Sequence, residues 1–313
     1  MAGRVTAKTE LFSSWAGGAL VIADESLSTG GRLWVCSVTG KDSKGYGRTP
    51  EKPAASLDYA IGLCTPNAGD IIYVMPGHSE TIVATNGFDV DVAGVKIVGL
   101  GWGGRRPTFL LDDTDAQVNI GATSVWIENL RFVAGISAVV AAVQVEGVTD
   151  ARFRNCEWYW GGTTGDDMIL GLELEAGSHR AIIENCRFLA ESGVAGAEAA
   201  IELTGASDNV RIENCEFVGD YSVACVHGDT ALSKGLMFLD NLVHNTDAGE
   251  PYLEVHAGTT GVIANTRGLA GGATIAANAV ADAMAHCENF VVNTAGTIAI
   301  IKGAAGSPAL DAD

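Results

Sequence analysis

The chain has 313 residues, and its 19 Lys and Arg stand against 38 Asp and Glu, which gives a formal net charge of −19. A surface this acidic repels phosphate backbones, so we exclude nucleic acid as an expected partner. The length suffices for one large hydrophobic core, and 40 Gly with only 7 Pro are typical of a β fold with many tight turns.

The first 31 residues do not share the pattern of the rest of the chain, and we interpret residues 1–31 as an N-terminal arm. They carry neither the apolar core nor the cleavage site of a signal peptide, and no apolar run in the chain is long enough to span a membrane. We therefore expect synthesis in a cytoplasm and no membrane partner. The arm is either a frayed terminus or an attachment segment that covers another protein with its apolar side chains, which are Phe12, Trp15, Leu20, Val21 and Ile22.

A short amphipathic helix is predicted over about residues 54–64. The stretch AASLDYAIGLC follows Pro53, and it places Leu57, Ile61 and Cys64 on one helical face. We expect this helix to cap the N-terminal end of the β structure that follows, because an uncapped end would expose core side chains and unpaired strands.

One phrase recurs six times between residues 125 and 268: VWIENLRF, ARFRNCEW, AIIENCRF, VRIENCEF, LMFLDNLV and GVIANTRG. Alternation of apolar and polar residues within the phrase is typical of a strand with one buried face. A second strand-like stretch accompanies the phrase, as in VQVEG, LELEAG and IELTG, and no helical pattern separates the strands. The chain is therefore predicted to be all-β, a single-stranded right-handed parallel β-helix of about eight coils over residues 32–303, followed by a flexible tail over 304–313.

Alignment of the phrases predicts three files of side chains that stack from coil to coil. A turn file holds asparagines, which tolerate left-handed backbone angles and can hydrogen-bond along a stack: Asn129, Asn155, Asn185, Asn214, Asn241 and Asn265. Two further files are predicted to point inward, an aromatic one of Phe132, Trp158, Phe188 and Phe217, and a smaller one of Leu130, Cys156, Cys186, Cys215 and Leu242. Three of the seven Cys thus fall in the core, where reduced thiols are expected.

The outward positions of the second strand carry the best candidates for catalysis. We expect one outward file to contain Gln144, Glu173, Glu202, Cys225 and Glu254. Glu175 is expected in the outward file next to it. Carboxylates one coil apart would lie about 5 Å from each other, near the separation found in retaining glycosidases. The loop pair Asp166 and Asp167 is a second candidate, as a Ca²⁺ ligand or an acid pair. A solvated or subunit-facing surface explains both sets more simply, so we assign no catalytic residue.

The stretch from residue 33 to 109 has a distinctive order: a strand, a Gly-rich loop with the phrase TPEKP, a short helix, GDIIYVMPGHSETI, and then DVDVAGVKIVGLGWGGRRPTF. Together with the repeats, this order resembles the pectate-lyase-like right-handed parallel β-helix proteins over about residues 33–303. The wording VMPGHSET followed by VAGVKIVGLGWGGRRPTF is similar to β-helix proteins of tailed bacteriophages, often virion structural proteins. The Gly-His-Gly and Arg-x-Lys phrases of polygalacturonase-like enzymes do not occur, so the resemblance carries no catalytic residue onto this chain.

Two classes of function remain. The first is a structural virion protein of a tailed bacteriophage, a homotrimeric β-helix that decorates or stabilises the capsid and binds the capsid or another virion protein through its arm. The second is a tailspike or free enzyme that binds or degrades a surface polysaccharide, as a lyase or glycoside hydrolase. We favour the first, because tailspikes of the resembling kind need a head-binding domain and a trimerising end for which this chain leaves little room. The six His have no metal-ligand spacing, so neither a metal nor a cofactor is expected.

Overall fold

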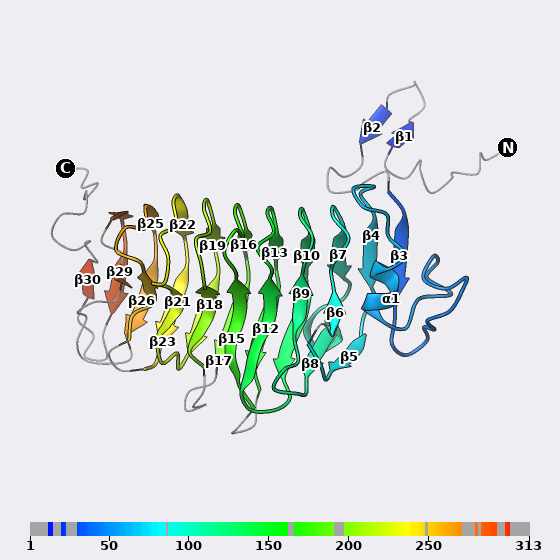
Figure 1. Ribbon diagram of the computed structural model, residues 1–313, viewed down its shortest axis with the longest axis horizontal. Coiled ribbons are helices and arrows are strands. Elements are labelled where there is room, and N and C mark those ends of the chain that lie inside the picture. Colours follow the sequence, from blue (N-terminus) through cyan, green and yellow to red (C-terminus); the bar gives the residue numbers. More distant parts are fainter. Residues whose placement is uncertain are drawn as a thin grey trace.

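In the computed structural model the chain winds into a right-handed parallel β-solenoid of about eight turns, whose coils stack along one long axis (Figure 1). The structure describes residues 12–14, 20–22, 30–85, 87–161, 166–190, 197–247, 250–270, 279–280, 283–292 and 298–300. The repeat predicted this architecture, because a stacked coil buries every second side chain of each strand and leaves the others outside.

Three sheets form the walls of the solenoid, and each strand pairs in parallel with its counterpart one coil away, except at the last strand of sheet 2. Sheet 1 consists of β3 (Arg32–Val35), β4 (Ile71–Val74), β7 (Lys96–Gly99), β10 (Trp126–Glu128), β13 (Arg152–Arg154), β16 (Ile182–Glu184), β19 (Arg211–Glu213), β22 (Leu236–Leu239), β25 (Gly261–Ala264) and β28 (Met284–Cys287). Sheet 2 consists of β5 (Ser79–Ile82), β8 (Thr108–Leu111), β11 (Arg131–Ala134), β14 (Glu157–Trp160), β17 (Arg187–Ala190), β20 (Glu216–Gly219), β23 (Leu242–Asn245), β26 (Arg267–Ala270), β29 (Phe290–Val292) and β30 (Ile298–Ile300). Sheet 3 consists of β6 (Phe88–Asp89), β9 (Val118–Ile120), β12 (Val139–Val145), β15 (Met168–Leu174), β18 (Ala199–Leu203), β21 (Ala224–Gly228), β24 (Leu253–Val255) and β27 (Ala279–Val280).

Helix α1 (Leu57–Ile61) lies between β3 and β4 in the chain, at the N-terminal end of the solenoid (Figure 1). Its N-cap is Ser56, whose side chain accepts a hydrogen bond from a backbone N–H of the first turn. The helix has five residues, within the predicted span of 54–64, and it contributes three side chains to the core: Leu57, Ala60 and Ile61. Its role as a cap stays a prediction.

The arm contains two described strands. β1 (Phe12–Ser14) pairs antiparallel with β2 (Leu20–Ile22), and the two strands form a sheet of their own. Trp15 lies outside the described residues, as does the predicted tail over 304–313. In the part of the chain that the structure describes, no helix combines the length and the hydropathy that crossing a membrane requires.

The predicted aromatic file is confirmed as the spine of the core. In-register pairing aligns Phe132, Trp158, Phe188 and Phe217 on successive coils of sheet 2, and all four side chains are fully buried. Successive ring centroids lie 5.3, 4.5 and 5.0 Å apart, within the range of favourable aromatic contacts. Stacking of like residues along the axis thus fills the interior and fixes the register between coils.

The predicted asparagine file forms the left-handed turn between sheets 1 and 2. Asn129, Asn155, Asn185, Asn214 and Asn265 have φ angles between 50° and 59°. The Asn155 amide donates a hydrogen bond to the Asn129 Oδ1 atom at 3.1 Å, and Asn214 donates to Asn185 in the same way. Asparagine is favoured here because it tolerates the left-handed region and links one coil to the next.

The predicted alignment is wrong by one position in the coil of LMFLDNLV. Asp240 takes the left-handed turn, with φ of 55°, and its Oδ1 accepts a hydrogen bond from the Asn265 amide at 3.0 Å. Asn241 therefore occupies the inward position predicted for Leu242. Its buried amide donates to the Ile212 carbonyl at 3.0 Å and accepts from the Cys215 N–H at 2.8 Å, so the polar group is satisfied inside the turn. Leu242 points outward with 46% of its surface exposed.

Sheet 2 ends in a way that the repeat did not predict. Its last strand, β30, runs antiparallel to β29, with Ile298 opposite Val292. Sheets 1 and 3 keep parallel pairing to their last described strands, β28 and β27. The strand direction is therefore reversed on one wall at its last described strand.

Candidate functional site

Sheet 3 presents a continuous file of polar side chains to the outside. Strand pairing aligns one such residue per coil from β6 to β24, and we call this file the acidic face: Asp89, Asn119, Gln144, Glu173, Glu202, His227 and Glu254. The structure thus places both principal candidates for catalysis, Glu173 and Glu202, side by side on adjacent strands.

The predicted place of Cys225 in this file is wrong. Strand β21 pairs with β18 so that Val226 lies beside Ile201 and His227 lies beside Glu202. Cys225 is fully buried, two residues before His227. The prediction aligned the final glycines of CVHG and IELTG, whereas Gly228 lies one residue after the partner of Glu202, so the register was shifted by two.

Glu173 is the most perturbed carboxyl group among the candidates. Its pKa is raised by partial burial and by the charges of Glu175 and Glu202. The Gln144 amide nitrogen donates to both Glu173 and Glu175, at 3.0 Å in each case, and so draws these two carboxyl groups toward one donor. Glycosidic acid–base chemistry uses two neighbouring carboxyl groups, one of which has a raised pKa.

His227 closes the other side of Glu202. Its Nδ1 lies 2.7 Å from the Glu202 Oε2 atom, and its Nε2 lies 3.4 Å from an oxygen of Asp229. The hydrogen bond to Glu202 raises the pKa of His227. Because the Glu202 carboxylate forms a hydrogen bond with the imidazole on the next coil, it is engaged in a contact between coils rather than turned toward a ligand. No group of three or more His, Cys, Asp or Glu in the described chain is arranged to hold a metal ion.

The loop pair lies far from these glutamates. Asp167 directly precedes β15 and Glu173 lies near the other end of this strand, so six residue steps, or about 20 Å, separate them. Asp167 is buried, and its carboxylate accepts a hydrogen bond from the Ala138 N–H. This contact indicates a structural role for Asp167 in holding the neighbouring turn, while Asp166 is half-buried beside Gly161.

Sheet 2 presents a very different surface, which sequence reasoning did not single out. One of its two outward files is apolar along nearly the whole solenoid, and we call it the apolar file: Leu110, Val133, Tyr159, Leu189, Val218, His244, Leu269 and Val292. The sequence signal was the apolar residue directly after the aromatic residue of Asn-Cys-Glu-aromatic or Asn-Cys-Arg-aromatic. A solvent-facing strand usually carries a polar side chain at such an outward position.

The second outward file of sheet 2 is charged in its N-terminal half. Arg131, Glu157, Arg187 and Glu216 lie on successive coils and pair along the stack. The Arg131 Nε lies 2.8 Å from Glu157, and the Arg187 Nε lies 2.7 Å from Glu216. These charges are therefore satisfied within the chain, and they fix the register of coils more than they stabilise the fold.

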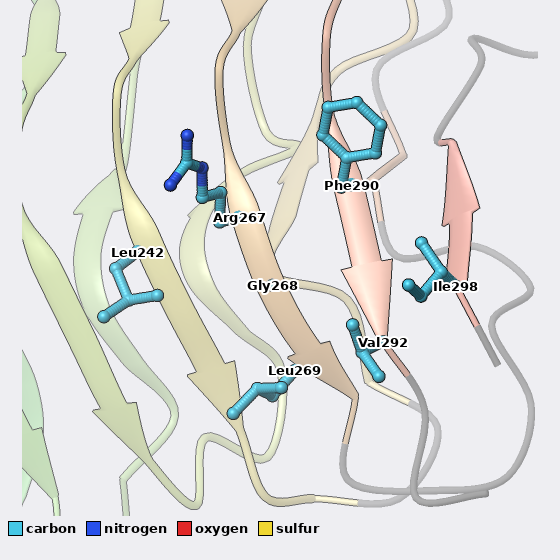
Figure 2. A pocket seen from close by; sticks show the side chains of 7 residues that line it. All are labelled: Leu242, Arg267, Gly268, Leu269, Phe290, Val292 and Ile298. Atoms are coloured by element: carbon cyan, nitrogen blue, oxygen red, sulfur yellow. The ribbon is translucent and has the colours of Figure 1, made fainter. Parts of the chain in front are cut away.

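The two outward files of sheet 2 come together at the C-terminal end, where exposed apolar side chains surround Arg267. Figure 2 shows Leu242, Leu269, Phe290 and Ile298 projecting from β23, β26, β29 and β30. These residues line a shallow hollow of about 460 Å³. Their side chains are between 41% and 67% exposed, which is unusual for residues of this size. We use the term apolar face for the apolar file together with Leu242, Phe290 and Ile298.

The fold is similar to that of two solved structures. One is a rhamnogalacturonan lyase, with a TM-score of 0.46 and 14% identity over 84% of this chain and 74% of that chain. The other is ORF18 of Geobacillus virus E2, with a TM-score of 0.40 and 14% identity over 80% of this chain and 59% of that chain. No protein-family model matches the sequence, and no curated protein matches it. Likeness this distant transfers neither an activity nor a partner.

Proposed function

We propose that the chain is a structural protein of a tailed-bacteriophage virion, a homotrimeric β-solenoid that decorates or stabilises the capsid. The sequence phrases that resemble phage β-helix proteins suggest the source. A rod with rigid internal register is suited to a load-bearing or surface-covering role.

One observation carries the structural role. The outward charged side chains of sheets 1 and 2 form ion pairs with one another from coil to coil along the solenoid, instead of converging on one site. Besides the ladder on sheet 2, the Arg152 Nη2 lies 2.6 Å from Glu184, and Arg180 forms two hydrogen bonds to Asp150 across adjacent turns. Side chains used in this way hold strands in register and leave few charged groups on sheets 1 and 2 available to act on a substrate.

Copy number in purified particles tests this proposal. Quantitative mass spectrometry of virions should find the chain in a fixed ratio to the major capsid protein. Hundreds of copies per particle would place it on the capsid, whereas a few copies would place it in the tail. Its absence from particles that form in cells expressing it would contradict a virion role.

A polysaccharide-degrading enzyme is the second candidate, and the Glu173–Glu202 pair favours it. If these carboxyl groups act on glycans, the purified chain should release oligosaccharides from bacterial-surface polysaccharides. Glu173→Gln and Glu202→Gln should each abolish that release, whereas Glu216→Gln on the opposite wall should not. Release that survives both substitutions would remove this pair from the reaction.

A further inference from the structure

We propose that the apolar face is the surface through which parallel copies of this chain pack around a common axis. The proposal rests on the homotrimer of the proposed function and assigns its subunit contact. The occupant of the face is thus a second copy of the chain, and the argument follows from charge, shape and the distribution of apolar residues.

Charge distinguishes sheet 2 from the acidic sheet 3 as a surface for self-association. The chain carries a net charge of −19, so two copies repel each other over most of their surfaces. From β8 to β29, the outward positions of sheet 2 hold three arginines and two glutamates, a net charge of +1: Arg131, Glu157, Arg187, Glu216 and Arg267. The acidic face of sheet 3, by contrast, carries four carboxylates and one His in its file. Sheet 2 is therefore a wall on which like-charge repulsion between copies is small.

The shape of the apolar face fits an axis better than a broad two-chain contact. The eight strands from β8 to β29 span about 34 Å at about 4.8 Å per spacing, and four residues across make a strip about 13 Å wide. Its flat area is about 450 Å², well below the roughly 800 Å² that each partner contributes to a standard interface. In a cyclic trimer, a long, narrow strip can face the symmetry axis. Each copy then contacts both of its neighbours through the same strip, and no further copy can be added.

The apolar residues also set the direction of packing. The N-terminal half of the face alternates Arg and Glu beside the apolar file, whereas the C-terminal half carries Leu242, Leu269, Phe290 and Ile298 around the hollow. A parallel arrangement places these exposed side chains against their own counterparts. An antiparallel one would bury the charged ladder of Arg131 and Glu157 against them, at a large desolvation cost.

Two outward substitutions and one matched control test the assignment in the full-length chain. Leu269→Glu and Leu242→Glu introduce a charge on the apolar face at positions that are each 46% exposed, so neither disturbs the core. Met237→Glu is the control, because Met237 is 41% exposed and points outward from sheet 1. Circular dichroism should show the same β content in all four proteins.

Light scattering after size exclusion gives the decisive readout. The wild type and Met237→Glu should have a mass of about 97 kDa, three times the 32.3 kDa chain, and the two leucine variants should fall to the mass of one chain. A one-chain mass for the wild type over a broad range of concentration would overturn the proposal. So would leucine variants that keep the wild-type mass, or a control that dissociates as they do.

A cysteine version tests the parallel direction. Under mild oxidation Leu269→Cys should give a covalent two-chain species, because residue 269 of one copy meets residue 269 of the next, and Met237→Cys should not. Failure of Leu269→Cys to cross-link in a particle of trimer mass would overturn the parallel arrangement. A trimer that behaves as described but is missing from virions would contradict the proposed function while leaving this interface intact.

Discussion

Trp158 and Phe188 stack with their ring centroids 4.5 Å apart and their planes within 11° of each other. Both side chains are fully buried, and Phe188 continues the stack to Phe217 at 5.0 Å. Because each ring contacts the coil before it and the coil after it, removal of one ring loosens three coils at once.

We therefore expect Phe188→Ala to lower the free energy of unfolding by about 3–5 kcal/mol. The neighbouring Arg187→Ala should lower it by less than about 1 kcal/mol, because Arg187 is exposed and its ion pair with Glu216 is solvated. Denaturant titration of both variants measures the difference. Equal effects would mean that the inside and outside positions of this strand are assigned wrongly.

Asn185 provides a test of backbone conformation that is separate from packing. Its φ of 55° lies in the left-handed region, where a side chain with a Cβ costs about 1–2 kcal/mol and glycine costs little. Asn185→Ala should therefore be less stable than Asn185→Gly, although both remove the hydrogen bond from Asn214. The difference between the two variants, read from denaturant titration, isolates the left-handed turn. A glycine variant no more stable than the alanine variant would contradict the prediction.

The sequence predicted the coil, the strand polarity and most of the inward files, because these follow from a period that repeats with little change. Prediction failed where the period shifted. Asn241 and Cys225 were each assigned to the wrong position. Asparagine suits both the left-handed turn and the polar interior of the same turn, so the residue type did not decide between them for Asn241. Cys225 was misplaced because the register of its strand is shifted. The placement of Glu173 beside Glu202 followed from strand pairing. The bond between Glu202 and His227 did not, because it depended on the shifted register.

The apolar face escaped prediction for a different reason. Leu189 and Val218 alternate with inward aromatic residues, so each strand alone has the pattern of a buried strand near a corner. Only the stacking of all coils shows that these side chains line up outside. A pattern read one strand at a time does not reveal a surface that many strands build together.

The acidic face makes stability depend on pH through Glu173. Its folded-state pKa lies above the ordinary value of 4.5, so the folded state holds this proton more tightly than the unfolded state does. The associated stability is fully present below about pH 4.5 and is lost as the pH rises through the raised pKa. Glu173→Gln should therefore raise the melting temperature at neutral pH, and the gain should vanish in acid. Glu216→Gln is the control, because it removes a partner of Arg187 and should bring no gain.

The arm is expected to act in attachment and not in folding. A chain that begins at Gly31 lacks β1 and β2, which pair only with each other in the described part of the chain. It should keep nearly the whole β content and melting temperature of the full chain, yet fail to join particles. Normal incorporation of the shortened chain would assign attachment to another part of the molecule, and loss of folding would give the arm a structural role.

The reversed strand β30 bears on a hazard that every open solenoid faces. An exposed last coil is a template for the first coil of another molecule, and repeated end-to-end addition is how amyloid-like fibres grow. On sheet 2, an incoming strand that ran in the direction of the coils would lie antiparallel to β30 and could not form the parallel pairing that the other coils form. On this one wall, the direction of a single short strand thus removes the parallel pairing through which the first coil of another molecule would continue the stack.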